Sequence, residues 1–78
     1  MIHVHVRITG ALAKPSGKDD LHVELPASSR IADLLEKVGY RPQHQRFILV
    51  AVNGQQRRHS GELADRDEVT LLMPTSGG

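Results

Sequence analysis

The sequence predicts an α+β domain in which one helix packs on a mixed sheet of four to five strands. Three observations predict it. Apolar and polar residues alternate in several segments, as they do in strands with one buried face. One segment repeats its apolar residues at the spacing of a helix. The chain has 78 residues, which form one small core and leave no room for a second domain or a large buried active site.

The first two strands are predicted at residues 2–9 and 21–25. In both, every second residue is apolar, beginning with Ile2 and Leu21. Residues 10–20 between them contain Pro, Ser, Gly and Asp, which favour turns. Two short strands joined in this way form an antiparallel hairpin.

The helix is predicted between residues 31 and 38. Ser28 or Ser29 can cap its first amide groups, and Asp33 favours the positive N-terminal end. Gly39 stands where a glycine commonly ends a helix. So short a helix is not stable alone and must pack its apolar stripe on the sheet. The stripe consists of Ile31, Leu34, Leu35 and Val38.

A second hairpin is predicted after the helix. Residues 40–45 are a connection, and residues 46–52 form a nearly all-apolar strand. Asn53-Gly54 indicates a type I′ turn, because this turn needs two positive φ angles. Residues 55–59 form a short, basic return strand at the edge of the sheet.

The last strand is predicted at residues 69–73, after a loop anchored by Leu63. It returns after both hairpins, so it must lie in the middle of the sheet if the helix covers one face. This arrangement is the β-grasp fold. We expect a domain over residues 1–74, followed by a flexible tail at residues 75–78. The predicted core consists of Val4, Val6, Val23, Ile31, Leu34, Leu35, Val38, Ile48, Val50, Val52, Leu63, Val69 and Leu71.

Composition limits the classes of function. Ten Lys and Arg against nine Asp and Glu give a formal net charge of +1, which argues against a dedicated nucleic-acid binder. The chain contains no cysteine, so disulfides, a thiolate zinc site and a cysteine nucleophile are excluded. No apolar run approaches the ~18 residues of a membrane span, and the alternating start is unlike a signal peptide. We therefore expect a cytoplasmic protein without a membrane partner.

The last two residues, Gly77 and Gly78, carry the functional prediction. They have no side chains to obstruct a narrow channel, and their backbone can adopt almost any φ and ψ. With Thr75 and Ser76 they form a tail that suits a carboxylate threaded into another enzyme's active site. The alternative is that they are only a frayed chain end.

Several segments resemble the ubiquitin-like sulfur carrier proteins, a family that includes the small subunit of molybdopterin synthase and the sulfur carrier of thiamine biosynthesis. These segments are residues 31–40, 52–54, 63–69 and 71–78. The resemblance covers essentially the whole chain and rests on the order of the segments together with the terminal diglycine. It implies a ubiquitin-like β-grasp fold.

The chain departs from this family at Arg66, where the family usually has glycine. If this position needs a positive φ, Arg66 is strained by about 1 kcal/mol. The short connection at residues 39–46 resembles the thiamine carrier. The long loop at residues 10–20 and the Met73-Pro74 pair resemble the molybdopterin subunit, which we favour.

The resemblance implies a cosubstrate and no enzyme. An adenylating enzyme of the ubiquitin-activating type would use ATP to convert the Gly78 carboxylate to an acyl adenylate. A sulfur donor would then displace AMP, so that Gly78 ends in a thiocarboxylate. A synthase subunit would receive the sulfur. The chain itself would bind no cofactor and no metal, and it has no glycine-rich phosphate loop.

A docking surface for these partners is predicted on the sheet face away from the helix. Alternation places Phe47, Leu49 and Ala51 on that face, with Leu72 of the last strand beside them. Leu49, Ala51 and Leu72 would form an apolar patch next to the tail, and Phe47 and Met73 are also expected to bind partners. The alternatives are a loop folded over this face and self-association.

Other interpretations stay open. A protein modifier would join Gly78 to lysines through an isopeptide bond, and a β-grasp binding module would need no diglycine. His3, His5 and His22 could bind zinc or nickel from one strand face, although exposed polar positions explain them equally. The basic run at residues 57–59 is interpreted as a solvated edge strand, with contact to a partner as the alternative.

Overall fold

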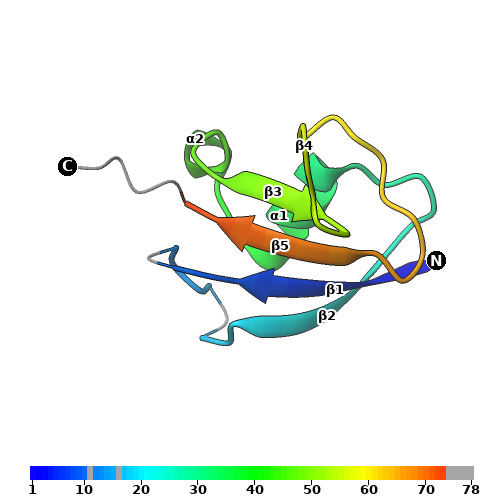
Figure 1. Cartoon of the computed structure of the whole chain (residues 1–78), viewed down its shortest axis with the longest axis horizontal. Helices are drawn as coiled ribbons and strands as arrows, with labels where there is room; N and C mark the ends of the chain where they lie inside the picture. The colour runs from blue at the N-terminus through cyan, green and yellow to red at the C-terminus, as the bar shows by residue number, and fades with distance from the viewer. Residues whose placement is uncertain (11, 16, 74–78) are drawn as a thin grey trace.

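The computed structural model describes residues 1–10, 12–15 and 17–73. Figure 1 shows the arrangement of the chain in space. In chain order the elements are β1 (Ile2–Ile8), β2 (Asp20–Leu25), α1 (Ile31–Val38), α2 (Pro42–Gln45), β3 (Leu49–Val52), β4 (Gln55–Arg57) and β5 (Glu68–Leu72).

The five strands of this part of the chain form one sheet in the order β2-β1-β5-β3-β4. β1 and β2 pair antiparallel, as do β3 and β4. β5 lies in the middle, parallel to β1 and antiparallel to β3. α1 lies behind the sheet in Figure 1 and covers one of its faces. The predicted ubiquitin-like β-grasp fold is therefore confirmed, including the central position of the last strand.

The core lies between α1 and the sheet and contains most of the predicted residues. Val23 and Val38, also predicted, are only partly buried and pack against it. The predicted core omitted Ile2, Ile8 and Leu25, which are buried in the first two strands. It also omitted Leu12 and Tyr40, which are buried although neither belongs to a periodic segment. The Tyr40 hydroxyl donates a hydrogen bond of 2.5 Å to the Ala13 carbonyl, which holds the β1–β2 connection near the end of α1. The buried core residues are Ile2, Val4, Val6, Ile8, Leu12, Leu25, Ile31, Leu34, Leu35, Tyr40, Ile48, Val50, Val52, Leu63, Val69 and Leu71.

The start of α1 differs from the prediction. Arg30, not Ser28 or Ser29, is the N-cap residue, and its backbone N–H donates to the Asp33 carboxylate at 2.8 Å. The Ser29 hydroxyl instead donates to the Pro26 carbonyl at 2.6 Å, so this serine stabilises the turn before the helix. The serine cap prediction was therefore wrong, although the acidic group in the first turn has a direct role.

The connection after α1 also differs from the prediction, because it contains the short helix α2. Pro42 stands at its first position, where a missing N–H costs nothing. The Gln45 side chain donates to the Tyr40 carbonyl at 2.9 Å and ties the helix to the end of α1. As a result β3 begins at Leu49 and not at residue 46. Its return strand, β4, ends at Arg57 and not at residue 59.

Two turns at the start of β5 are joined by side chains. Asn53 and Gly54 have φ angles of 52° and 84°, as the predicted turn requires. The Asn53 side chain donates to Asp67 and accepts from the backbone N–H of Glu68, both at 3.0 Å. Arg66 has a φ of 68°, so the position at which strain was expected does adopt the left-handed conformation.

The helices of the described residues are too short and too polar to cross a membrane.

Candidate functional site

The apolar patch predicted on the open sheet face is assembled by the pairing of β3 with β5. Leu49 lies opposite Leu72, and Ala51 lies opposite Thr70. All four are partly exposed, whereas the residues between them along the strands, Val50 and Leu71 among them, are buried. Alternation therefore puts Leu49, Ala51 and Leu72 on the sheet face opposite α1.

Phe47 and Met73, the other two residues predicted to bind partners, lie at one end of the sheet. Because Leu49 pairs with Leu72, Ile48 before β3 and Met73 after β5 lie at the same end, and Phe47 precedes Ile48. Phe47 is 52% exposed and Met73 is 38% exposed, which is unusual for large apolar side chains. Leu49, Ala51 and Leu72 are called the apolar patch below.

The tail predicted to carry the chemistry, Thr75, Ser76, Gly77 and Gly78, lies outside the described residues. The described chain fixes the point from which it starts. The backbone N–H and the hydroxyl of Thr9 both donate to the Leu71 carbonyl, at 2.9 and 3.1 Å. The end of β5 is thus tied to the end of β1, and the chain leaves the sheet from its central strand beside the apolar patch.

A second cluster occupies the same face over β1 and β2. His5 lies opposite His22, and their rings stack with centroids 4.8 Å apart. The His5 Nδ1 atom lies 2.6 Å from a Glu68 oxygen, and Nε2 contacts Asp20. Two carboxylates on the two ring nitrogens require both nitrogens to be donors, so this geometry fits the protonated imidazolium. The hydrogen bond to Asp20, then that to Glu68, raises the pKa of His5.

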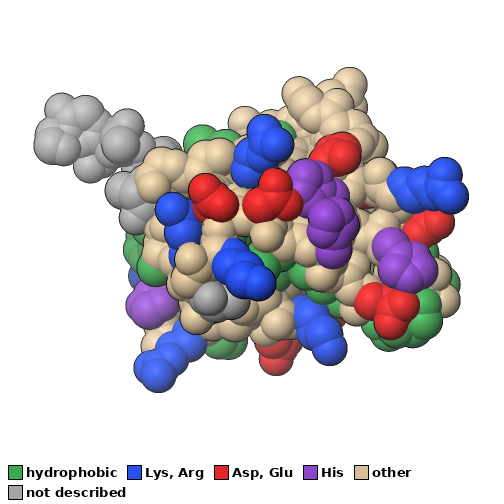
Figure 2. Space-filling model, turned by 90° about the horizontal axis from the view of Figure 1, so that it is seen from below, with side chains coloured by type: hydrophobic (Ala, Val, Ile, Leu, Met, Phe, Trp, Pro, Cys, Tyr) green, Lys and Arg blue, Asp and Glu red, His purple; other side chains and the backbone are tan. Residues whose placement is uncertain are grey.

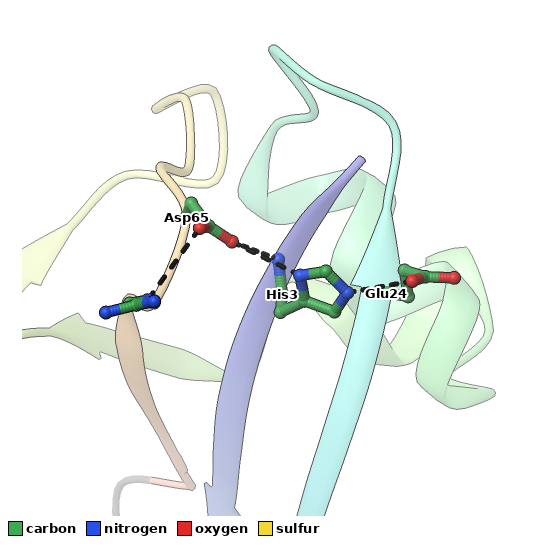
Figure 3. A network of polar contacts seen from close by, with 4 residues as sticks. His3, Glu24 and Asp65 are labelled. Atoms are coloured by element: carbon green, nitrogen blue, oxygen red, sulfur yellow. Dashed lines mark hydrogen bonds and ion pairs between the residues drawn. The ribbon is translucent and has the colours of Figure 1, made fainter.

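His3, two residues before His5 on β1, also contacts two carboxylates. Its Nε2 atom lies 2.8 Å from Glu24, and its Nδ1 atom lies 3.4 Å from Asp65 (Figure 3). Asp65 also accepts the His3 backbone N–H at 2.7 Å, and this hydrogen bond is the main reason that the pKa of Asp65 is lowered. His3 thus joins three separate segments of the chain.

His3 and His5 therefore contact carboxylates, and His22 stacks on His5. They do share one face, as predicted, and Figure 2 shows histidine side chains beside acidic ones. Within the described ranges, no group of three His, Asp or Glu side chains is placed to hold a metal ion. Sequence reasoning missed the carboxylate partners. Glu24 could have been found from the hairpin register, but Asp65 and Glu68 reach β1 only through the distant β5.

The predicted basic edge is exposed, and only part of it is a strand. Arg57 ends β4, and Arg58 follows it. The His59 Nε2 atom lies 2.8 Å from the Ile48 carbonyl, which fastens the chain after β4 to the residue before β3. This contact leaves the two arginine side chains at the edge of the sheet, next to Leu49.

The order β2-β1-β5-β3-β4 around one main helix, with an apolar patch beside the end of the central strand, defines a ubiquitin-like protein. The model of the ThiS family matches residues 6–78. The chain therefore belongs to the ThiS family of ubiquitin-like sulfur carrier proteins. No curated protein sequence matches the chain.

Solved structures agree with this fold. A putative molybdopterin converting factor, subunit 1, from Pyrococcus furiosus is 25% identical, with a TM-score of 0.78 over 96% of this chain and 100% of that one. SAMP1 from Haloferax volcanii is 24% identical, with a TM-score of 0.76 over 97% and 99%. A chain of the complex of subunits 1 and 2 of the Helicobacter pylori molybdopterin-converting factor is 20% identical, with a TM-score of 0.64 over 99% and 100%.

Proposed function

We propose that this protein carries sulfur as a thiocarboxylate on Gly78 for the biosynthesis of a cofactor. The observation that carries the proposal is the family match, which extends to residue 78 and so includes Gly77-Gly78. The position of β5 supports it. A tail that starts from the central strand, beside an exposed apolar patch, can enter a partner's active site while the domain stays bound outside.

The chemistry takes place in partner enzymes. An adenylating enzyme of the ubiquitin-activating type uses ATP: the Gly78 carboxylate attacks the α-phosphorus, and pyrophosphate leaves. A sulfur donor then attacks the acyl adenylate and displaces AMP. Apart from the Gly78 carboxylate, which is the nucleophile of the first step, the chain contributes no catalytic group or metal, and it binds no cofactor of its own. It acts as a cosubstrate, and neither step makes it an enzyme.

We place the chain in molybdopterin biosynthesis in preference to thiamine biosynthesis. The similarity to the Pyrococcus furiosus subunit over almost the whole of both chains supports this choice. The Helicobacter pylori relative was solved in a complex of its subunits 1 and 2. By analogy, the sulfur acceptor for this chain is a larger synthase subunit that holds the apolar patch while the tail enters.

Mass spectrometry of the purified chain tests the proposal. Incubation with the adenylating enzyme, ATP and a sulfur donor should replace one oxygen by one sulfur, and the mass should rise by that difference. Deletion of Gly78 should abolish the mass change and leave the circular dichroism spectrum unchanged. A wild-type chain that gains neither an adenylate nor sulfur would refute the proposed function.

A protein modifier is the second candidate. The small archaeal modifier protein 1 of Haloferax volcanii (SAMP1) has a TM-score of 0.78 to this chain, and this similarity supports the second candidate. Both functions begin with adenylation of Gly78, so they differ only in the final acceptor. Extracts of the source cells distinguish them. A ladder of lysine adducts that depends on Gly78 indicates a modifier, whereas free thiocarboxylated protein indicates a sulfur carrier.

A further inference from the structure

Three arginines line a shallow hollow at the β3–β4 edge of the sheet. They are Arg46, Arg57 and Arg58, and all three side chains are exposed. Leu49 and His59 also line the hollow, and no Asp or Glu does. Arg46 comes from the segment after α2, so the hollow brings it next to two arginines at the end of the β3–β4 hairpin. We call it the arginine hollow.

These arginines have no acidic partner among the described residues. The ion pairs there involve only His3, His5 and Arg66 as the basic member. Arg57 donates one long hydrogen bond of 3.5 Å to a backbone carbonyl. The Arg46 guanidinium lies 5.0 Å from the centroid of the Phe47 ring. Most of their guanidinium N–H groups are therefore free to bind an anionic group.

The two sides of the sheet consequently differ in charge. Over β1 and β2, four carboxylates contact only two histidines, His3 and His5. The arginine hollow lies at the opposite edge, where Arg57 pairs with Val50 and so starts on the α1 side of the sheet. The apolar patch lies between the two, and Leu49 belongs both to the patch and to the wall of the hollow.

We propose that the arginine hollow binds an acidic segment, rich in Asp and Glu, of the adenylating partner. This inference rests on the proposed function. Guanidinium groups bind carboxylates with two parallel hydrogen bonds, which fixes orientation as well as position. An apolar centre with arginines at its rim is the usual composition of a protein interface. The acidic segment would therefore set the direction in which the partner lies across the apolar patch, with the end of β5 toward its active site.

The first experiment measures association of the full chain with the purified adenylating enzyme of the source organism. The test variant is Arg46→Glu/Arg58→Glu, because neither side chain makes a hydrogen bond among the described contacts. The control is Lys18→Glu/Lys37→Glu, which makes the same charge change at exposed positions in the β1–β2 connection and on α1. Association rates are recorded at about 0.02 M and about 0.3 M salt, where the screening length differs severalfold.

The arginine variant should associate about tenfold more slowly than the control at low salt, because complementary charge raises association rates by about that factor or more. Its rate should also lose most of its dependence on salt. Equal rates for the two variants would overturn the proposal. So would a variant that keeps its rate with the enzyme but loses binding to a single-stranded oligonucleotide, since the hollow would then be a nucleic-acid surface.

Failure of the proposed function gives a different result. If the wild-type chain forms no adenylate with the enzyme and ATP, both the sulfur-carrier function and the arginine hollow's role are refuted. If the wild-type chain is adenylated and the arginine variant is adenylated at the same rate below saturation, only the role of the hollow is refuted.

Discussion

His5 is the residue whose protonation state is coupled most directly to the fold. Its ring is held between Asp20 and Glu68 and stacks on His22, and Arg7 lies close enough to influence Asp20. The pKa of His5 is raised in the folded chain above the unfolded value of 6.5. Protonated His5 therefore stabilises the fold fully below that value, and the stabilisation is lost as the pH rises through the higher folded value.

We expect the urea concentration at the unfolding midpoint of the wild-type chain to decrease as the pH is raised from about 5.5 to about 9. The decrease should be smaller for His5→Gln, because glutamine does not titrate. His44→Gln is the matched control, since His44 is an exposed histidine on α2. This control should keep the wild-type dependence on pH. If the His5→Gln variant and the control lose stability equally across this range, the link between His5 protonation and stability is absent.

Arg66 is strained by its backbone conformation. Its φ is 68°, and its side chain is 92% exposed and makes only a 4.0 Å contact with Asp65. Arg66→Gly should therefore raise the free energy of unfolding by up to about 1 kcal/mol, because glycine adopts this conformation without the Cβ clash. Chemical denaturation measures the change. Arg41→Gly, at an exposed position with a φ of −72°, should instead lower the stability or leave it unchanged.

At the scale of elements, α1 depends on its buried stripe. Leu35 has no exposed surface and lies in the core between the helix and the sheet. Leu35→Ala should lower the free energy of unfolding by about 2–5 kcal/mol, which is a large part of the stability of a small domain. The exposed neighbour Glu36 provides the control, and Glu36→Ala should change the stability by less than about 0.5 kcal/mol. A thermal melt of Leu35→Ala that matches this control would exclude the packing of α1 described above.

Periodicity decided which elements could be predicted from the sequence. β1 and α1 each repeat their apolar residues over several positions, so their faces and the core between them follow from the pattern. α2 has four residues, which is too short for any period, and only Pro42 at its first position indicated a helix. Leu12 is buried without a pattern because Tyr40 fastens the loop that contains it.

The candidate site was predictable to a similar extent. Alternation in β3 and the β-grasp order were sufficient to place Leu49 beside Leu72. The carboxylate partners of the histidines were not predictable, because Glu68 lies 63 positions from His5 and meets it only through the parallel pairing of β1 with β5. The arginine hollow depends on the path taken after α2, which no local signal fixes.

At the scale of the whole molecule, the apolar patch should matter for partners more than for the fold. Leu72 is only partly buried and faces away from α1. Leu72→Glu should therefore change the free energy of unfolding by less than about 1 kcal/mol while weakening binding to both the adenylating enzyme and the synthase subunit. Gln55→Glu, which adds the same charge at an exposed site opposite the buried Val52, is the control. Wild-type affinity of Leu72→Glu for both partners in calorimetric titrations would exclude a docking role for the patch.

The central position of β5 has a consequence for the synthesis of the protein. Neither hairpin pairs with the other, because β5 separates β1 from β3 in the sheet. β5 is the last of the described strands to leave the ribosome, and contacts across so many residues form late in folding. A nascent chain that stops before β5 has two unjoined hairpins and lacks Leu72, so its apolar patch is incomplete. A partner that recognises this surface would therefore bind only chains translated through β5, and chains that end earlier would not compete with the complete protein for that partner.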